Sequence, residues 1–327
     1  MRDIAARVNV SLNTVSLSLM DSELVHPDTK ARVMQAVQEL GYRPNITAQN
    51  LRRGAVRTIG IMIPDTHNFH FWDIVEGVQE EAYQNGYGVV LANTDLNRER
   101  ELETLRGLLE RRYDGVILAT TYSEYAPQEM RSLIQQGGAV VAMGRTWEGA
   151  DRVAYVRHDA AYRVLDHLYE LGHRQIGLVM GVARPELAGE RLHAYEKFVA
   201  DRQLANLIEH CGPTLPEAIE ATDRLLQRTP RPTAIVSVND FLALGVYRSL
   251  GLHGCHIPDD VSVAAFDNTH VAPYLFPSLT SVDFGGREIG RISVQLVIQR
   301  LADHKRPQQI VEVPPTLIVR ESTAPPR

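Results

Sequence analysis

The sequence lacks most features of a secreted or membrane-embedded protein. Its 327 residues contain two cysteines, Cys211 and Cys255, too few for a disulfide framework. No apolar run approaches the roughly 20 residues of a membrane-spanning helix, and the N-terminus does not have the pattern of a signal peptide. Low-complexity sequence is limited to a Pro-rich tail after Ser322, which we expect to be disordered. We therefore expect a cytoplasmic protein with no membrane partner.

Motifs for catalysis, cofactors and metals are also missing. The chain has no Gly-x-x-x-x-Gly-Lys phosphate loop and no Gly-x-Ser-x-Gly nucleophile elbow. His67 and His70 are three residues apart, but no Cys or carboxylate set with zinc spacing accompanies them. Asp159 follows His158, where it fits the start of a helix better than a catalytic dyad. We expect no cofactor, no metal and no enzymatic activity.

Charge is distributed unevenly along the chain. Residues 1–58 carry eight basic and five acidic side chains, a net of +3, which leaves −9 for the remainder because the whole chain is −6. Four arginines and no acid lie between Arg43 and Arg57. A basic head on an acidic body favours nucleic-acid binding by the head.

Residues 4–19 have the pattern of a helix-turn-helix. Ile4, Ala5 and Val8 share one helical face, and the small Ala5 would let a second helix cross closely. Asn9 stands where the turn needs a residue that tolerates a positive φ. The alternative is an ordinary three-helix cap on an enzyme.

The second helix of this motif would lie in the major groove of DNA. Ser11 is a suitable N-cap for it, and Val15 and Leu19 would face inward. A third helix is predicted over residues 28–40. The side chains expected to face outward from the second helix are Leu12, Asn13, Ser16 and Leu17.

Residues 44–53 predict a short hinge helix. Ala48 and Leu51 share one face; a small residue permits close approach to a narrow groove, and a Leu can wedge between base steps and kink the duplex. A helix this short is marginal in isolation, so we expect it to fold on DNA. The alternative is an interdomain linker with a few solvated arginines.

The chain resembles the lac repressor/galactose repressor family from end to end. Two motifs carry the resemblance: Val10-Ser11-Leu12-Asn13-Thr14-Val15-Ser16 and Tyr42-Arg43-Pro44-Asn45-Ile46-Thr47-Ala48-Gln49-Asn50-Leu51. The resemblance implies base reading by Leu12, Asn13 and Leu17, and phosphate contacts by Thr14 and Ser16. It also implies minor-groove contact by Ala48 and intercalation by Leu51. The candidate DNA-binding residues are Ser11, Leu12, Asn13, Thr14, Ser16, Leu17, Asn45, Ala48, Leu51 and Arg52.

The N-terminal region departs from the family pattern at three places. The family usually has two or three more residues before the first helix, including a Thr that caps it, so we expect the true start to lie upstream of Met1. Leu17 stands where a base-reading Arg or His is common, and Met20 where an Asn is usual. Leu17 can touch a thymine methyl but cannot hydrogen-bond a base edge, so the operator sequence is not predicted.

The remaining chain alternates apolar strands with amphipathic helices, which predicts parallel sheets covered on both faces. Two such runs exceed one doubly wound domain, so we expect two lobes with a cleft between them. The resemblance implies a periplasmic-binding-protein-like body that the chain crosses three times. The expected boundaries are 1–57 for the head with its hinge (44–53) and 58–324 for the body, with lobe 1 at 58–156 and 285–311 and lobe 2 at 157–284 and 312–324. Strands are predicted over 58–64, 87–92, 114–119, 139–143, 175–181, 234–238 and 261–266.

Ligands of open parallel sheets bind beyond the carboxyl ends of the strands. The loops there supply Arg donors, Asp acceptors and aromatic rings, which suit a polyhydroxylated molecule. The candidate effector-binding residues are Asn68, Phe71, Arg145, Arg191, Asn239 and Asp267, of which the resemblance independently implies Arg191, Asn239 and Asp267. Asn239 or Asp240 could instead only cap a helix, and Arg191 and Asp267 could form a structural ion pair. Relatives often have a stacking aromatic near residues 211–214; Phe71, Trp72 or Trp147 could replace it here.

These features predict a DNA-binding transcriptional regulator, most simply a repressor. We expect its partners to be a near-palindromic double-stranded operator, a small polar effector such as a sugar, and a second copy of the chain in a homodimer or tetramer. One alternative is a solute-binding protein of a transport system, against which the basic head and the missing signal peptide argue. The other is an α/β enzyme with a helical cap.

Overall fold

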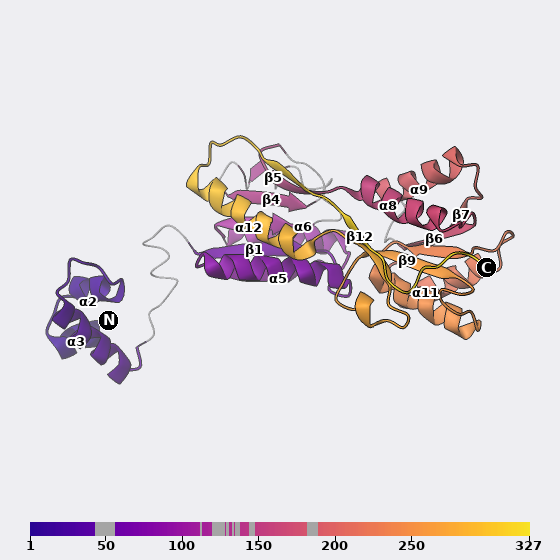
Figure 1. Cartoon of the computed structure of the whole chain (residues 1–327). Helices are drawn as coiled ribbons and strands as arrows, with labels where there is room; N and C mark the ends of the chain where they lie inside the picture. The colour runs from indigo at the N-terminus through magenta and orange to yellow at the C-terminus, as the bar shows by residue number, and fades with distance from the viewer. Residues whose placement is uncertain are drawn as a thin grey trace. The chain divides into compact units, whose positions relative to one another are not determined.

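The computed structural model describes residues 1–42, 56–111, 113–119, 138–143, 148–181 and 189–327, with isolated positions between 128 and 134. The chain divides into two compact units, Met1–Val56 and Arg57–Arg327, called here the head and the body (Figure 1).

Residues 1–42 of the head form three helices, α1 (Arg2–Val8), α2 (Leu12–Leu19) and α3 (Pro27–Glu39). Asn9 ends α1 in the left-handed conformation with φ 57°, as its place in the turn predicts. No side chain caps the start of α1. The predicted third helix would place Leu40 on the apolar stripe with Val33 and Ala36, but Leu40 caps α3 and is 47% exposed, so that assignment was wrong. The small core of the head comprises Ile4, Ala5, Val8, Val15, Val33 and Ala36.

The first lobe of the body is a fully parallel sheet in the order β11-β5-β4-β3-β1-β2. Its strands are β1 (Thr58–Ile63), β2 (Gly88–Asn93), β3 (Gly115–Leu118), β4 (Ala139–Met143), β5 (Asp151–Tyr155) and β11 (Ile310–Val313). Its helices include α5 (Phe69–Gln84), α6 (Arg98–Glu110) and α12 (Gly286–Ala302).

Helices α5 and α12 lie side by side against this sheet (Figure 1). Glycines permit the close contact: a Cβ on Gly290 would lie 2.2 Å from the Ile74 carbonyl oxygen, and one on Gly77 would lie 2.0 Å from that of Arg287.

The second lobe has the sheet order β12-β10-β9-β8-β6-β7, in which only the β10–β12 pair is antiparallel. Its strands are β6 (Ile176–Gly181), β7 (Leu207–Cys211), β8 (Ala234–Ser237), β9 (Ser262–Asp267), β10 (Thr280–Asp283) and β12 (Thr316–Ile318). Its described helices are α8 (Arg157–Glu170), α9 (Gly189–Asp201), α10 (Leu215–Leu226), α11 (Asp240–Leu252) and the 3-10 helix η3 (Ala272–Tyr274).

The chain passes between the lobes three times: between β5 and α8, between β10 and α12, and between β11 and β12. The predicted fold class is confirmed. The first sheet retains Glu312 and Val313, which the sequence analysis assigned to lobe 2, because both pair with β5.

The C-terminal tail is ordered, so the expectation of disorder after Ser322 was wrong. Thr323 lies 3.0 Å from His167, the Ala324 carbonyl oxygen lies 2.9 Å from His173, and Arg327 pairs with Asp259. None of the helices in the described part of the chain is long and apolar enough to span a membrane.

Candidate functional site

Helix α2 presents the candidate base-reading surface of the head. Leu12 is 46% exposed and Asn13 is also exposed. Ser16 and Leu17 are partly buried, so they are less accessible than the periodicity predicted. Val15 is fully buried and fixes which face of α2 turns outward.

Two hydroxyls stand at the N-terminus of α2. Ser11 Oγ accepts a hydrogen bond from the Thr14 backbone N–H at 3.0 Å, as the predicted cap requires, and lies 2.8 Å from Thr14 Oγ1. Backbone N–H groups and the helix dipole make such an end suitable for a phosphate. The geometry is therefore compatible with the expected backbone contacts.

The positive charge of the N-terminal region does not come from the three helices. Residues 1–42 contain four basic and five acidic side chains. Three of the four basic groups are engaged: Arg7 with Glu39 at 3.3 Å, Lys30 with Asp21 at 2.8 Å, and Arg32 with the Val8 carbonyl oxygen at 2.8 Å. The excess lies from Arg43 onward. The candidates Asn45, Ala48, Leu51 and Arg52 lie outside the described residues.

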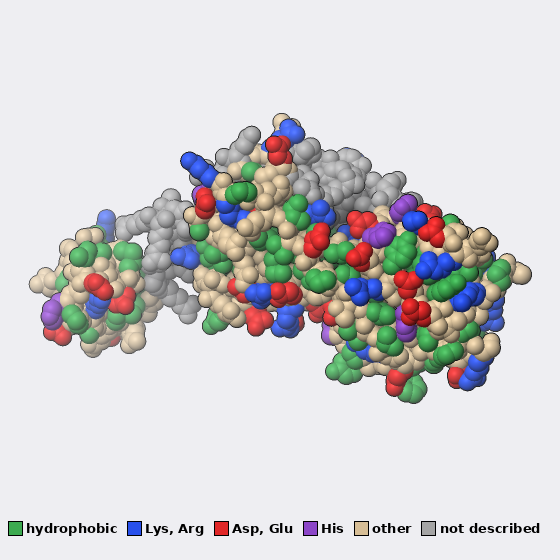
Figure 2. Space-filling view, turned by 45° about the horizontal axis from the view of Figure 1, so that its top comes forward, with side chains coloured by type: hydrophobic (Ala, Val, Ile, Leu, Met, Phe, Trp, Pro, Cys, Tyr) green, Lys and Arg blue, Asp and Glu red, His purple; other side chains and the backbone are tan. Residues whose placement is uncertain are grey.

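On the face of the body that Figure 2 shows, Lys and Arg side chains are interspersed with Asp and Glu. The excess of basic residues from Arg43 to Arg57 in the sequence favours this segment, together with the helices that precede it, as the nucleic-acid-binding part.

A small cavity of about 80 Å³ brings together most of the candidate effector residues. Five of the six predicted residues line it, and the sixth, Arg145, lies outside the described part of the chain. Sequence reasoning missed four others. The lining residues are Asn68, His70, Phe71, Tyr155, Arg157, Arg191, Asn239, Asp267 and Phe284.

Asp267 occupies the end of β9 in an unusual backbone conformation. Its φ is 101°, a region that L-residues rarely adopt and that often marks functional positions. The side chain is buried, and no hydrogen bond to its carboxylate is found among the described residues. The carboxylate is therefore available to accept hydrogen bonds from a ligand.

Arg191 reaches the same cavity from α9. One of its Nη atoms donates to the Val238 carbonyl oxygen at 2.8 Å, whereas its buried Nε has no partner in the described residues. Burial lowers the pKa of Arg191 to about 10, and nearby Asp267 opposes this shift. No direct ion pair joins Arg191 to Asp267 within the described ranges, so the structural ion pair considered above is not observed.

Both asparagines of the cavity also cap helices. Asn68 Oδ1 accepts from the His70 backbone N–H at 3.0 Å at the start of α5, and Asn239 Oδ1 accepts from the Leu242 N–H at 2.8 Å at the start of α11. The capping alternative for Asn239 is therefore correct, but it uses only the amide oxygen and leaves the amide nitrogen for a ligand.

His70 and Tyr155 form a polar pair on the wall of the cavity. His70 Nε2 lies 3.1 Å from the Tyr155 hydroxyl, while His70 Nδ1 is buried and has no hydrogen-bond partner among the described residues. Burial lowers the pKa of His70 and raises that of Tyr155. The sequence analysis considered His70 only as a metal ligand and did not identify β5, which ends at Tyr155.

Asp240, adjacent to Asn239, has a structural role. Its carboxylate accepts from the Thr269 backbone and hydroxyl at 2.6 and 3.0 Å and from Ser281 Oγ at 2.6 Å. Burial, with the nearby charge of Asp267, raises the pKa of Asp240 to about 7. It links the loop after β9 to β10 and does not line the cavity.

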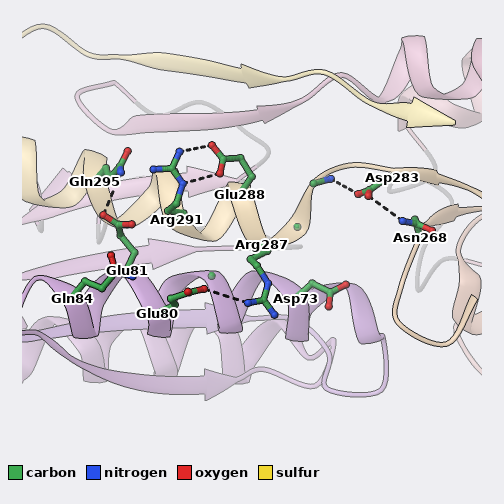
Figure 3. A pocket seen from close by; sticks show the side chains of 13 residues that line it. Asp73, Glu80, Glu81, Gln84, Asn268, Asp283, Arg287, Glu288, Arg291 and Gln295 are labelled. Atoms are coloured by element: carbon green, nitrogen blue, oxygen red, sulfur yellow. Dashed lines mark hydrogen bonds and ion pairs between the residues drawn. The ribbon is translucent and has the colours of Figure 1, made fainter. Parts of the chain in front are cut away.

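A larger hollow of about 740 Å³ lies along α5 and α12 (Figure 3). Among the residues that line it, Arg287 pairs with Glu80 at 3.2 Å and Arg291 pairs with Glu288, while Asp283 accepts hydrogen bonds from Asn268 and the Gly285 backbone N–H. The smaller cavity instead holds buried donors without partners. Chemistry rather than size therefore favours the smaller cavity as the effector site.

No cluster of three or more metal-ligating side chains is present in the described ranges. His67 lies 2.9 Å from Asp65 and is not joined to His70. His158 and Asp159 are both exposed in the first turn of α8.

Comparison with known proteins extends over both units. Residues 1–45 match the model of bacterial regulatory proteins of the lacI family, and residues 165–323 match a periplasmic binding protein-like domain. The HTH-type transcriptional repressor PurR of Vibrio campbellii is 27% identical over 98% of each chain. The complex of the transcriptional regulator CelR with cellobiose is 26% identical with a TM-score of 0.73, and the lac repressor dimer bound to operator and the anti-inducer ONPF is 24% identical with a TM-score of 0.85; each covers 98% of both chains.

The match of the head to a regulatory family disfavours a solute-binding protein of a transport system. The chain belongs to the LacI/GalR family of bacterial transcriptional regulators, which bind DNA under the control of an effector.

Proposed function

We propose that this regulator is a cytoplasmic, non-enzymatic repressor that binds a near-palindromic operator as a homodimer, with its operator affinity set by a sugar-like effector in the cavity of the body. The main support for this proposal is the set of residues that line the cavity. Asp267 and Arg191 from lobe 2 face Asn68, His70 and Phe71 from lobe 1. A ligand that contacts both lobes favours their closed arrangement by its differential affinity for the two states.

The chemistry of the cavity supports a polyhydroxylated ligand. The Asp267 carboxylate is available to accept from hydroxyls, Arg191 supplies donors, and Phe71 and Phe284 provide apolar walls. The similar regulator CelR has been solved with cellobiose. We assign effector contacts to the six residues predicted from the sequence, Asn68, Phe71, Arg145, Arg191, Asn239 and Asp267.

The DNA contacts are proposed in two groups. The first group lies on and beside α2. Bases are read by Leu12, Asn13 and Leu17, and the phosphate backbone of the DNA is contacted by Ser11, Thr14 and Ser16. Asn45, Ala48, Leu51 and Arg52 act in the minor groove and on its phosphates. Exposure of Leu12 and Asn13 and the hydroxyls at the start of α2 support the first group. The concentration of arginines after residue 42 supports the second.

Two exposed aromatic side chains support a homodimer. Tyr274 and Phe276, in and beside η3, are 87% and 96% exposed, which is costly for large apolar groups on a monomer. A single small head has too little interface for tight specific binding, whereas a two-fold dimer reads two half-sites.

A gel-shift assay with the full chain tests this function. DNA flanking the gene is titrated in the presence and absence of a panel of sugars and sugar derivatives. We expect a specific shift that at least one member of the panel changes. A variant with Asn13→Ala and Leu12→Ala is the control for the head, and its equal binding to the operator would contradict the assigned reading surface. Absence of any specific DNA binding would contradict the function itself.

A further inference from the structure

Three basic side chains reach the effector cavity from three different helices. His70 comes from α5, Arg157 is the first residue of α8, and Arg191 lies near the start of α9. Asp267 is the only carboxylate that lines this cavity among the described residues. The two guanidinium groups therefore outnumber the carboxylate in a site with aromatic walls.

The donors of these side chains are largely uncommitted. The Arg157 guanidinium lies 4.4 Å from the centre of the Tyr155 ring, and no ion pair or hydrogen bond to it is found in the described part of the chain. The buried Arg191 Nε and the buried His70 Nδ1 also have no hydrogen-bond partner there, although His70 Nδ1 lies 3.9 Å from Asp267 Oδ1. A neutral polyol would supply hydroxyls to Asp267, but it would leave the excess positive charge uncompensated.

We propose that the effector carries an anionic group, a carboxylate or a phosphate, held between Arg157 and Arg191 beside hydroxyls that donate to Asp267. This inference rests on the effector cavity of the proposed function. It narrows the class of effector from any sugar-like molecule to a sugar acid or a sugar phosphate. Such a group offers acceptors to both guanidinium forks, and charge-assisted hydrogen bonds strengthen where water is excluded.

The charged groups around the cavity favour the binding of an anion. Burial lowers the pKa of Arg191 to about 10; Asp267 opposes that shift and Arg157 adds to it. Burial lowers the pKa of His70 as well. A bound anion would raise the pKa of His70, so binding should be tighter at mildly acidic pH and should take up a proton. The groups that face His70 are Asp267, Arg157, Arg191, Asp283 and Tyr155.

Calorimetry on the full-length protein tests the proposal with matched probes. One set is glucose, gluconate and glucose 6-phosphate; the other is ribose, ribonate and ribose 5-phosphate. We expect at least one anion to bind about tenfold or more tightly than its neutral parent sugar. Comparison of the sugar acids with the sugar phosphates shows whether the cavity accepts a carboxylate or a phosphate.

Two substitutions on α8 assign the preference to Arg157. Arg157→Gln should remove the preference for the anion, and Arg157→Lys, which retains the charge, should keep part of it. The control is Arg163→Gln, an exposed position on the same helix. Circular dichroism and operator binding without ligand should be the same for all three variants.

The proposal is overturned if a neutral sugar binds as tightly as its derivatives, if Arg157→Gln keeps the preference, or if no anion of either set binds at millimolar concentration. Operator binding is measured on the same samples. Loss of anion preference with intact operator binding contradicts only this inference, whereas absence of specific operator binding in the parent contradicts the proposed function.

Discussion

His70 and Asp267 meet across the two lobes of the body, with 3.9 Å between His70 Nδ1 and Asp267 Oδ1. His70 is carried by α5 of the first lobe, and Asp267 ends β9 of the second. The same imidazole contacts the Tyr155 hydroxyl through its other nitrogen. A movement of one lobe relative to the other changes the distance between these two side chains. Because both also line the effector cavity, they couple ligand binding to lobe closure.

Removing the Asp267 carboxylate should weaken effector binding. Each charge-assisted hydrogen bond contributes about 1.5–3 kcal/mol, so Asp267→Ala should bind at least about tenfold more weakly to the best ligand of the sugar panel. Asp267→Asn is the matched variant, because Asn tolerates the positive φ of this position better than Ala does.

Calorimetry measures both Asp267 variants, and gel shift without ligand measures their DNA affinity, which should not change. Normal effector binding by Asp267→Ala would remove this residue from the site. A loss confined to Asp267→Ala, with normal binding by Asp267→Asn, would show that backbone strain rather than charge is responsible.

The lowered pKa of His70 makes a pH-dependent contribution to stability. The unfolded chain protonates this histidine near pH 6.5, whereas the folded chain does so only at lower pH. The free energy of unfolding is therefore unaffected by this histidine well above pH 6.5. Below pH 6.5 it decreases as the pH falls, by no more than about 1.4 kcal/mol per pH unit. Burial lowers the pKa values of His167 and His173 too, so their contributions have the same sign.

Urea unfolding between mildly acidic and neutral pH tests this contribution. His70→Gln should lose less stability on acidification than the parent, because it lacks the buried imidazole whose pKa is lowered in the folded state. An identical pH dependence of the parent and His70→Gln would show that His70 protonates equally in both states.

The fold could be predicted well from the sequence because its signals are local. A few neighbouring residues are enough to predict an apolar strand such as Thr58–Ile63 or a helix cap such as Ser11. Strand β5 was missed because it begins with Asp151, whose charge suggests a loop. In the structure Arg300 and Arg306 both pair with this fully buried carboxylate. That compensation comes from residues about 150 positions away and has no local signature.

The candidate site was predictable only where strand ends mark it. The rule for carboxyl ends of parallel strands identifies Asp267 and Asn239 directly. His70 and Arg157 lie in helices, and Phe284 lies at a crossover between the lobes, so only the tertiary arrangement brings them to the cavity. The ordering of the tail was unpredictable for the same reason, since its partners His167 and His173 are distant in sequence.

Ser11 has separable roles in helix capping and DNA contact. Ser11→Ala removes the bond to the Thr14 N–H and should destabilise the head by about 1 kcal/mol. Ser11→Asp restores the cap but adds a negative charge beside the proposed phosphate contact. It should unfold at the parent temperature and bind operator more weakly. Equal operator affinity of parent and Ser11→Asp would place the phosphates elsewhere.

Dimer formation should depend on the exposed aromatic loop after η3. Phe276→Ser removes a 96% exposed ring and should weaken self-association by about tenfold or more if the ring is an interface anchor. The comparison variant is Tyr83→Ser, which removes a ring 85% exposed on α5 of the other lobe; a larger loss of self-association there than at Phe276 would place the interface on α5. Light scattering at micromolar concentration measures both. A parent that is monomeric with and without operator DNA would contradict the homodimer.

Leu51 and Arg52 should have separable effects on DNA binding, shape readout by Leu51 and phosphate neutralisation by Arg52. If Leu51 wedges between base steps, it unstacks one step at a cost of a few kcal/mol that the bent interface offsets. Leu51→Ala should then lose operator affinity and bending, yet keep nonspecific binding and its salt dependence. Arg52→Gln should do the reverse: it should weaken binding to all sequences and reduce the log–log salt slope by about 0.9 per lost contact, or about 1.8 per dimer. Bending assays and salt titrations on both variants measure these effects. If Leu51→Ala bends and discriminates the operator as well as the parent does, residues 44–53 serve only as a tether between the three N-terminal helices and the body.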